Sequence, residues 1–195
     1  MIYRNRNLKP LIDVIVKHES GGDPNIVWGG IARKDRPSRP LTDMTIGQVL
    51  AWQDRIDPHY PSEASGKFQI MEDTLRGLWR EAGMSLSTKF TEATQDRLGI
   101  QLMRRRGLDA WIDGEISTAK FANSLAKEWA SLPVVSGKNV GKSYYAGDGL
   151  NKALTSPKTV LTAIQRAEAI PDTPTSFLSR LSAWWRSLVS MIQRT

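Results

Sequence analysis

A carboxylate interrupts the apolar face of the first amphipathic segment, LKPLIDVIVKHESGG, which spans residues 8–22. The apolar side chains of that face recur at helical spacing at Leu8, Leu11, Ile12 and Ile15. Four residues after Ile15, the next position of the same face is occupied by Glu19. The pattern therefore places an ionisable carboxyl group where a buried Leu or Ile is expected.

Two interpretations of Glu19 follow from this position. It can be an ordinary polar residue at a helix end, where periodicity fades before Gly21 and Gly22. Alternatively it is a general acid, because burial and the negative end of the helix dipole both raise the pKa of a carboxyl group. A carboxyl group that keeps its proton can protonate the leaving oxygen of a sugar linkage.

Helical segments dominate the chain and would have to position this group. Periodicity and capping signals predict helices over residues 8–19, 45–53, 72–82, 91–106, 117–132 and 156–169. The strand signal is weak and allows at most one small hairpin, within residues 27–40 or 67–70. The sequence thus predicts a mainly α fold, a helical bundle with at most a small β-hairpin.

Composition divides the chain into three parts. Residues 1–169 contain all of these segments and predict one main domain. Residues 170–176, IPDTPTS, have the composition of a linker. Residues 177–195 form a separate, cationic amphipathic C-terminal helix by their pattern.

The charge of the chain indicates an anionic partner. The net charge is +7 and the sequence pI is about 9.8. We do not expect nucleic acid, because the arginine run at 104–106 is explained as cations in the last turn of a helix. The absence of Cys and the presence of only two His predict no metal site. We expect a monomer without a cofactor.

Three short motifs occur in a characteristic order: HESGG at 18–22, SEASGKFQI at 62–70 and KEWASLP at 127–133. In this order they resemble phage lysozymes of the lambda type, which belong to the lysozyme and lytic transglycosylase superfamily. The resemblance covers roughly residues 8–169 and excludes the C-terminal segment. It implies an α+β lysozyme-like fold and cleavage of the β-1,4 bond between N-acetylmuramic acid and N-acetylglucosamine in the glycan strands of peptidoglycan.

The resemblance also implies roles for individual residues. The catalytic Glu of that family ends the first long helix and is followed by Ser or Gly, which matches Glu19. A motif of a small residue, Gly, an aromatic and Gln lines the glycan cleft in the family. Its matches here are Ser65, Gly66, Phe68 and Gln69.

The mechanism depends on whether a second carboxylate takes part. A hydrolytic muramidase usually needs one, and Glu63, three residues before Gly66, is a candidate unless it is a solvated loop charge. Lambda-type enzymes work with one Glu, while the 6-hydroxyl of the sugar attacks the anomeric carbon and leaves a 1,6-anhydro end. We therefore prefer a lytic transglycosylase, with a hydrolytic muramidase that uses Glu63 or an Asp as the alternative. A non-catalytic wall-binding or membrane-binding antibacterial protein is a further alternative.

Three aromatic residues are candidates for contact with the glycan. Trp28 lies in the Gly-rich loop after Glu19 and is either a core residue or a cleft residue that stacks on a sugar. Tyr144 and Tyr145 occur where relatives of the lambda type keep a cleft aromatic, and one of them is expected to touch substrate.

The C-terminal segment carries a wide apolar stripe that includes Trp184 and Trp185. Arg180, Arg186 and Arg194 lie on the rest of its surface, and the segment contains no acid. It is either the last helix of the domain or an interfacial helix that binds anionic membrane or lipopolysaccharide. The linker and the Trp pair favour the second interpretation.

The N-terminal residues contain cations but no apolar signal region. We therefore expect synthesis in the host cytoplasm and action on periplasmic peptidoglycan, either after release through a holin or as a virion-borne enzyme. These observations together predict a phage endolysin.

Overall fold

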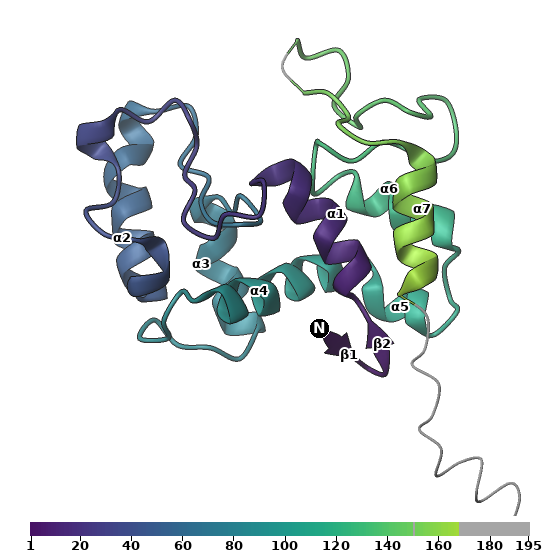
Figure 1. Ribbon diagram of the computed structural model, residues 1–195, viewed down its shortest axis with the longest axis horizontal. Helices are drawn as coiled ribbons and strands as arrows, with labels where there is room; N and C mark the ends of the chain where they lie inside the picture. Colours follow the sequence, from purple (N-terminus) through teal and green to yellow (C-terminus); the bar gives the residue numbers. More distant parts are fainter. Residues whose placement is uncertain (150, 168–195) are drawn as a thin grey trace, which may run out of the picture.

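The computed structural model describes residues 1–149 and 151–167. Seven α-helices and one two-stranded antiparallel sheet occur in this part of the chain (Figure 1). The strands are β1 (Ile2–Tyr3) and β2 (Arg6–Asn7), and the helices are α1 (Lys9–Glu19), α2 (Ile46–Ile56), α3 (Glu72–Glu81), α4 (Glu92–Arg105), α5 (Leu108–Ile112), α6 (Thr118–Leu125) and α7 (Pro157–Arg166). The predicted mainly α fold with a small hairpin is confirmed.

The helices form two groups on either side of α1 and α4. Helices α2 and α3 pack against each other on one side, and α5, α6 and α7 lie on the other (Figure 1). Helix α1 packs on α7, while α4 contacts both α3 and α5. The C-terminal end of α1, where Glu19 stands, therefore points into the region between the two groups (Figure 1).

Local sequence signals explain where several helices begin and end. The side chains of Thr45 and Gln48 form a capping box at the start of α2. The Ser156 hydroxyl accepts a hydrogen bond from the N–H of Thr159 at the start of α7. Gly83, with φ of +65°, follows α3 at the position where a left-handed residue ends a helix.

Two sequence-based expectations about the elements were wrong, and one helix was missed. The hairpin lies at residues 2–7 and not within 27–40 or 67–70, where only isolated bridges such as Val27–Ser65 form. The short helix α5 was not predicted. Helix α6 ends at Leu125 instead of Leu132, because the N–H groups of Lys127 and Glu128 turn to carbonyls three residues back.

The linker and the C-terminal segment lie outside the described residues. This applies to residues 170–176 and to the predicted membrane-binding side chains of Arg180, Trp184, Trp185, Arg186 and Arg194. Within the described residues, no helix is long and apolar enough to cross a membrane.

Candidate active site

Glu19 is the last residue of α1 and is held there by the packing of that helix. The side chains of Leu11 and Ile15 on the same face are fully buried in the core. Ser20 then closes the helix, because both its N–H and its hydroxyl donate to the carbonyl of Val16 at 3.0 Å. The glycines at 21 and 22 have φ of +64° and +95°, which turn the chain away from the carboxyl group.

The carboxyl group of Glu19 is half-buried and has one hydrogen-bonding partner residue among the described residues, Ser131. The Ser131 hydroxyl donates to Oε1 of Glu19. Burial raises the pKa of Glu19, and the hydrogen bonding of Ser131 opposes that increase without cancelling it. The expected elevated pKa is therefore confirmed in direction.

No charged side chain among the described residues contributes to the shift in the pKa of Glu19. A second carboxylate close to Glu19 would raise this pKa further, and a close cation would lower it. The site is therefore built around one carboxyl group whose properties are set by burial and by a neutral hydroxyl.

Ser131 belongs to the third motif, KEWASLP, but its role was not predicted. It reaches Glu19 because α6 ends early and the chain turns through residues 126–130. The Ser131 carbonyl accepts a hydrogen bond of 2.8 Å from the N–H of Leu154, which ties Ser131 to the segment that precedes α7. The position of Ser within the motif was the available signal. Glu19 and Ser131 are 112 residues apart in the chain, so no local pattern indicated that they form a hydrogen bond.

The second motif packs against the third. The Phe68 ring is 2 % exposed, and its centroid lies 6.2 Å from that of Trp129. The indole N–H of Trp129 donates to the Phe68 carbonyl at 3.4 Å. Gly99 on α4 provides the space for the Phe68 ring, because a Cβ at this position would lie 2.3 Å from Cζ of Phe68. Phe68 thus joins the two motifs within the core and does not present its ring to solvent.

Gln95 on α4 ties the loop that follows the first motif to the second motif. Its Oε1 accepts the N–H of Lys67 at 2.8 Å, and its Nε2 donates to the Pro24 carbonyl at 2.9 Å. Gly66 has φ of +71°, and a Cβ there would lie 2.5 Å from Oε1 of Gln95. The Gly66 N–H also donates to the Ile26 carbonyl at 2.8 Å. This glycine is therefore required by both its conformation and its neighbour.

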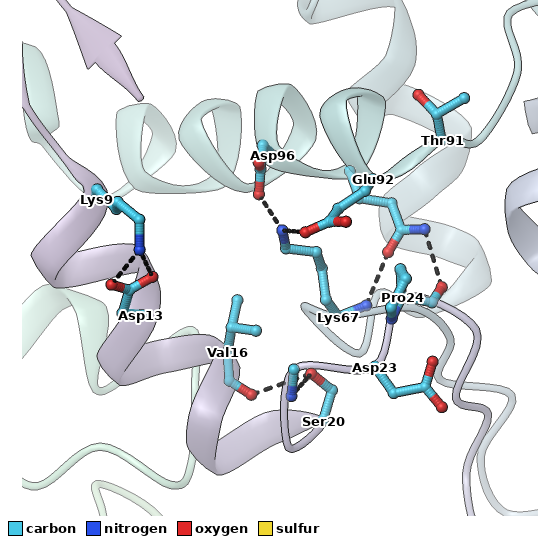
Figure 2. A network of polar contacts seen from close by, with 12 residues as sticks. Lys9, Asp13, Val16, Ser20, Asp23, Pro24, Lys67, Thr91, Glu92 and Asp96 are labelled. Carbon is cyan, nitrogen blue, oxygen red and sulfur yellow. Dashed lines mark hydrogen bonds and ion pairs between the residues drawn. The ribbon is translucent and has the colours of Figure 1, made fainter.

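The buried ammonium group of Lys67 adds an ionic contact to the same junction. Lys67 Nζ lies 2.6 Å from Asp96 Oδ1 and 3.2 Å from Glu92 Oε1 (Figure 2). Asp96 and Glu92 belong to α4, so the loop that carries the second motif is bound to that helix by both its backbone and a side chain.

The other two residues of the second motif have different environments. The Ser65 side chain is fully buried and accepts a hydrogen bond of 3.0 Å from Gln53 Nε2. Gln69 is half-buried, has φ of +50°, and donates through Nε2 to the Gly66 carbonyl at 2.9 Å. Of the four predicted cleft residues, Ser65 and Phe68 therefore support the loop from inside, and Gln69 retains an exposed surface.

Glu63 is not a solvated loop charge. Glu63 is only 3 % exposed, and its Oε1 accepts the N–H of Glu72 at 2.8 Å. Glu72 is the first residue of α3, so the carboxylate of Glu63 satisfies an N–H group that the helix leaves unpaired and complements the positive end of its dipole. This geometry gives Glu63 a structural function at the start of α3.

Trp28 is half-buried and packs against the core. Its backbone N–H donates to the carbonyl of Ala64, a residue of the second motif, at 2.9 Å. The indole ring lies directly over Gly30, where a Cβ would come within 1.9 Å of the ring. The core environment expected for Trp28 is therefore present in part, and contact of this residue with a glycan stays a prediction.

Tyr144 and Tyr145 are exposed and lie edge to face, with ring centroids 5.3 Å apart. The Tyr145 hydroxyl donates to the Lys127 carbonyl at 2.7 Å, and Lys127 Nζ lies 5.2 Å from the centroid of the Tyr144 ring. Both tyrosines are therefore anchored to the first residue of the third motif.

No group of side chains suited to hold a metal ion occurs in residues 1–149 and 151–167.

The three motifs are brought together by these contacts. Glu19 bonds to Ser131, Phe68 packs on Trp129, and Gln95 bridges the loops of Pro24 and Lys67. A family model described as Endolysin matches residues 51–156, a region that includes the second and third motifs and begins after Glu19. No curated protein and no solved structure matches the chain. The match covers more than half of the sequence, and the chain therefore belongs to the endolysin family, the phage enzymes that degrade the bacterial cell wall.

Proposed function

We propose that this endolysin is a lytic transglycosylase that cleaves the β-1,4 bond between N-acetylmuramic acid and N-acetylglucosamine, with Glu19 as general acid and base. The observation that carries the proposal is the half-buried carboxyl group of Glu19, whose pKa is raised by burial and is unaffected by any second carboxylate among the described residues. A carboxyl group in this state holds the proton that glycosidic cleavage needs.

The proposed reaction uses Glu19 twice. Glu19 first donates its proton to the glycosidic oxygen, and the bond from that oxygen to C1 of the muramoyl residue breaks. The 6-hydroxyl of the same residue forms a new bond to C1, and its proton passes to the carboxylate of Glu19. The products are a free 4-hydroxyl and a 1,6-anhydromuramoyl end, no water is consumed, and Glu19 recovers its proton.

The Ser131 hydroxyl has a defined part in this cycle. It donates to the ionised carboxylate that exists between the two proton transfers and so limits the increase in the pKa of Glu19. We therefore assign Ser131 the function of a positioning residue that orients the carboxyl group and moderates its pKa.

Replacement of Glu63 separates this proposal from the hydrolytic alternative. With Glu19 as the single acid, Glu63→Gln should lower stability only modestly. The Gln amide oxygen can still accept the N–H of Glu72, and only the interaction of a charge with the helix dipole, worth about 0.3–1 kcal/mol, is lost. Activity should fall only slightly at temperatures where the variant is folded. In a hydrolase that uses Glu63 to stabilise the oxocarbenium-like state, the same change should lower the rate by orders of magnitude.

Mass spectrometry of digested peptidoglycan provides the readout for both proteins, since anhydro and reducing ends differ by one water. We expect anhydro ends from wild type and from Glu63→Gln alike. Reducing ends from wild type, together with a large loss in Glu63→Gln, would establish the hydrolytic alternative. Asp54→Asn is a suitable control, because Asp54 is an exposed carboxylate that pairs with Arg76 on α3.

The pH dependence of the reaction should follow the protonation of Glu19. Activity should fall as the pH rises through its elevated pKa, because the ionised form has no proton to donate. Ser131→Ala removes a hydrogen bond that favours the ionised form, so the falling limb of the kcat profile should move to higher pH.

Ser20→Ala is the matched control for this shift, since the Ser20 hydroxyl bonds to the Val16 carbonyl and to the Gly22 N–H. We expect that control to leave the limb in place. A limb that stays unchanged in Ser131→Ala would contradict the function assigned to Ser131.

A further inference from the structure

A polar pocket lies beside the third motif and has no function in the chemistry above. It encloses about 510 Å³. Its polar lining comes from Asn123, Lys127, Ser136, Lys138, Asn139 and Tyr144. No acidic side chain is among the described residues that line it.

The walls of this pocket are held in place by hydrogen bonds. The Asn123 amide accepts the N–H of Val135 at 2.8 Å and donates to the Ser136 hydroxyl at 2.8 Å. The Tyr145 hydroxyl is bonded to the Lys127 carbonyl, and the Lys127 ammonium group lies over the Tyr144 ring. The pocket is therefore formed before any ligand binds, which reduces the entropy lost on binding.

The positive charge of the pocket is not neutralised within the described part of the chain. Neither Lys127 nor Lys138 forms an ion pair there, and both side chains belong to exposed residues. Glu128, the acid next to Lys127, is already paired with Arg106 at 2.6 Å. Two cations at the mouth of one pocket favour an anionic ligand.

The pocket is also close to Glu19. Val134 lines it and follows Ser131, the partner of Glu19, by three residues. Three residues span at most about 11 Å when fully extended. The N–H of Val134 donates to the Lys142 carbonyl at 2.8 Å, and its carbonyl accepts from the Gly141 N–H at 2.8 Å, so this segment is fixed to the turn at residues 141–142.

We propose that this pocket binds the peptide stem of peptidoglycan through its carboxylates, an inference that rests on the proposed function. The stem is attached to the lactyl group of N-acetylmuramic acid, the residue whose C1 lies at the bond to be cleaved. A muramoyl residue beside Glu19 would therefore carry its peptide within reach of the pocket. The ammonium groups of Lys127 and Lys138 would pair with the carboxylates, while Asn139 and Ser136 offer neutral groups to the peptide backbone.

Binding of a soluble stem peptide tests this inference directly. The probe is a free tetrapeptide stem, which contains no glycosidic bond, titrated by calorimetry into the full-length Glu19→Gln protein. We expect saturable binding that weakens at least tenfold in Lys127→Ala/Lys138→Ala and weakens with added salt. Lys120→Ala, an exposed lysine of α6 outside the pocket, is the matched control and should bind as the parent does.

Three results would overturn the inference. The first is unchanged binding in the double variant or in Lys138→Glu. Lys138→Glu changes one exposed loop residue and therefore provides the test if the double variant does not fold. The second is equal binding by a probe whose side-chain and terminal carboxylates are all amidated. The third is competition by inorganic phosphate at equal concentration, which would identify a site for anions in general.

A kinetic comparison distinguishes failure of this inference from failure of the proposed function. The substrates are intact peptidoglycan and the same material with its stems removed by an amidase. The ratio of kcat/KM on intact to denuded glycan should fall at least fivefold in Lys127→Ala/Lys138→Ala and stay unchanged in Lys120→Ala. An unchanged ratio would contradict the peptide pocket, whereas hydrolytic products or an active Glu19→Gln would contradict only the mechanism.

Discussion

Glu19→Gln is expected to abolish cleavage of peptidoglycan while the fold is retained. Gln has nearly the same shape and can accept the hydrogen bond from Ser131. Its amide protons are not acidic, however, so it cannot transfer a proton to the glycosidic oxygen. General acid and base catalysis contributes about 10²–10⁴-fold to a rate, so the loss should be at least of this order. Turbidity loss of purified peptidoglycan and release of soluble fragments measure the effect.

Asp13→Asn is the matched control for this replacement. Asp13 lies on the same helix as Glu19, is exposed, and pairs with Lys9 at 2.7 Å. Its neutralisation should leave turnover close to that of wild type. A Glu19→Gln protein with near-normal activity would refute the central assignment, and an equal loss in Asp13→Asn would indicate a general effect of charge on α1.

Glu19→Gln should become more stable relative to wild type as the pH rises. Because burial raises the pKa of Glu19, the native state binds its proton more tightly than the unfolded chain does. This contribution is fully present below the ordinary pKa of Glu and is lost as the pH rises through the elevated pKa. Glu19→Gln removes the titration, so its stability relative to wild type should increase across that window. Urea unfolding at several pH values measures the difference.

Gly66→Ala should produce the largest loss of stability among single substitutions near the site. The positive φ of Gly66 disfavours any L side chain by about 1–2 kcal/mol. The added Cβ would also displace Oε1 of Gln95, which lies 2.5 Å away, and so disturb its bonds to Lys67 and Pro24. Loss of these two hydrogen bonds adds about 1 kcal/mol each. At about 2–4 °C per kcal/mol for a chain of this size, Tm should fall by about 6–16 °C.

Gly83→Ala provides the comparison that isolates the contact with Gln95. Gly83 has φ of +65°, close to that of Gly66, but a Cβ there would meet nothing within 4 Å. Its replacement should therefore cost only the backbone strain, and Tm should fall clearly less than in Gly66→Ala. Equal decreases in the two variants, measured by calorimetry, would show that Gln95 adjusts freely and that the junction does not depend on it.

Much of the helical framework follows from local sequence. The apolar stripe of α1, the capping box of Thr45 and Gln48, and Gly83 after α3 all act within a few residues, so periodicity and capping rules were sufficient to place them. The hairpin at residues 2–7 was missed because two-residue strands carry no alternating pattern. The early end of α6 was missed because its apolar periodicity continues through Trp129 and Leu132, both of which are buried although the helix has ended.

The candidate site was predictable in part. Glu19 was identified from a single defect in an apolar stripe, and the structure gives it the burial and the raised pKa that this position implied. Glu63, by contrast, caps α3, a function that depends on the N–H of Glu72, nine residues later at the start of that helix. Phe68 and Ser65 belong to the right motif, but only the packed structure shows that their side chains are covered by Trp129, Gly99 and Gln53.

The sequence by itself determined the mainly α class, the ends of most helices and the carboxyl group at the end of α1. These features depend on hydrogen bonds and apolar spacing within one or two helical turns, which are readable from a linear pattern. Only the tertiary structure decided which side chains face that carboxyl group. Ser131 reaches Glu19, Gln95 bridges the loops of Pro24 and Lys67, and the basic pocket of Lys127 and Lys138 forms beside them. Such contacts join residues that are far apart in the chain and arise when α1, α4 and the turn after α6 pack around a common core, so no local pattern encodes them.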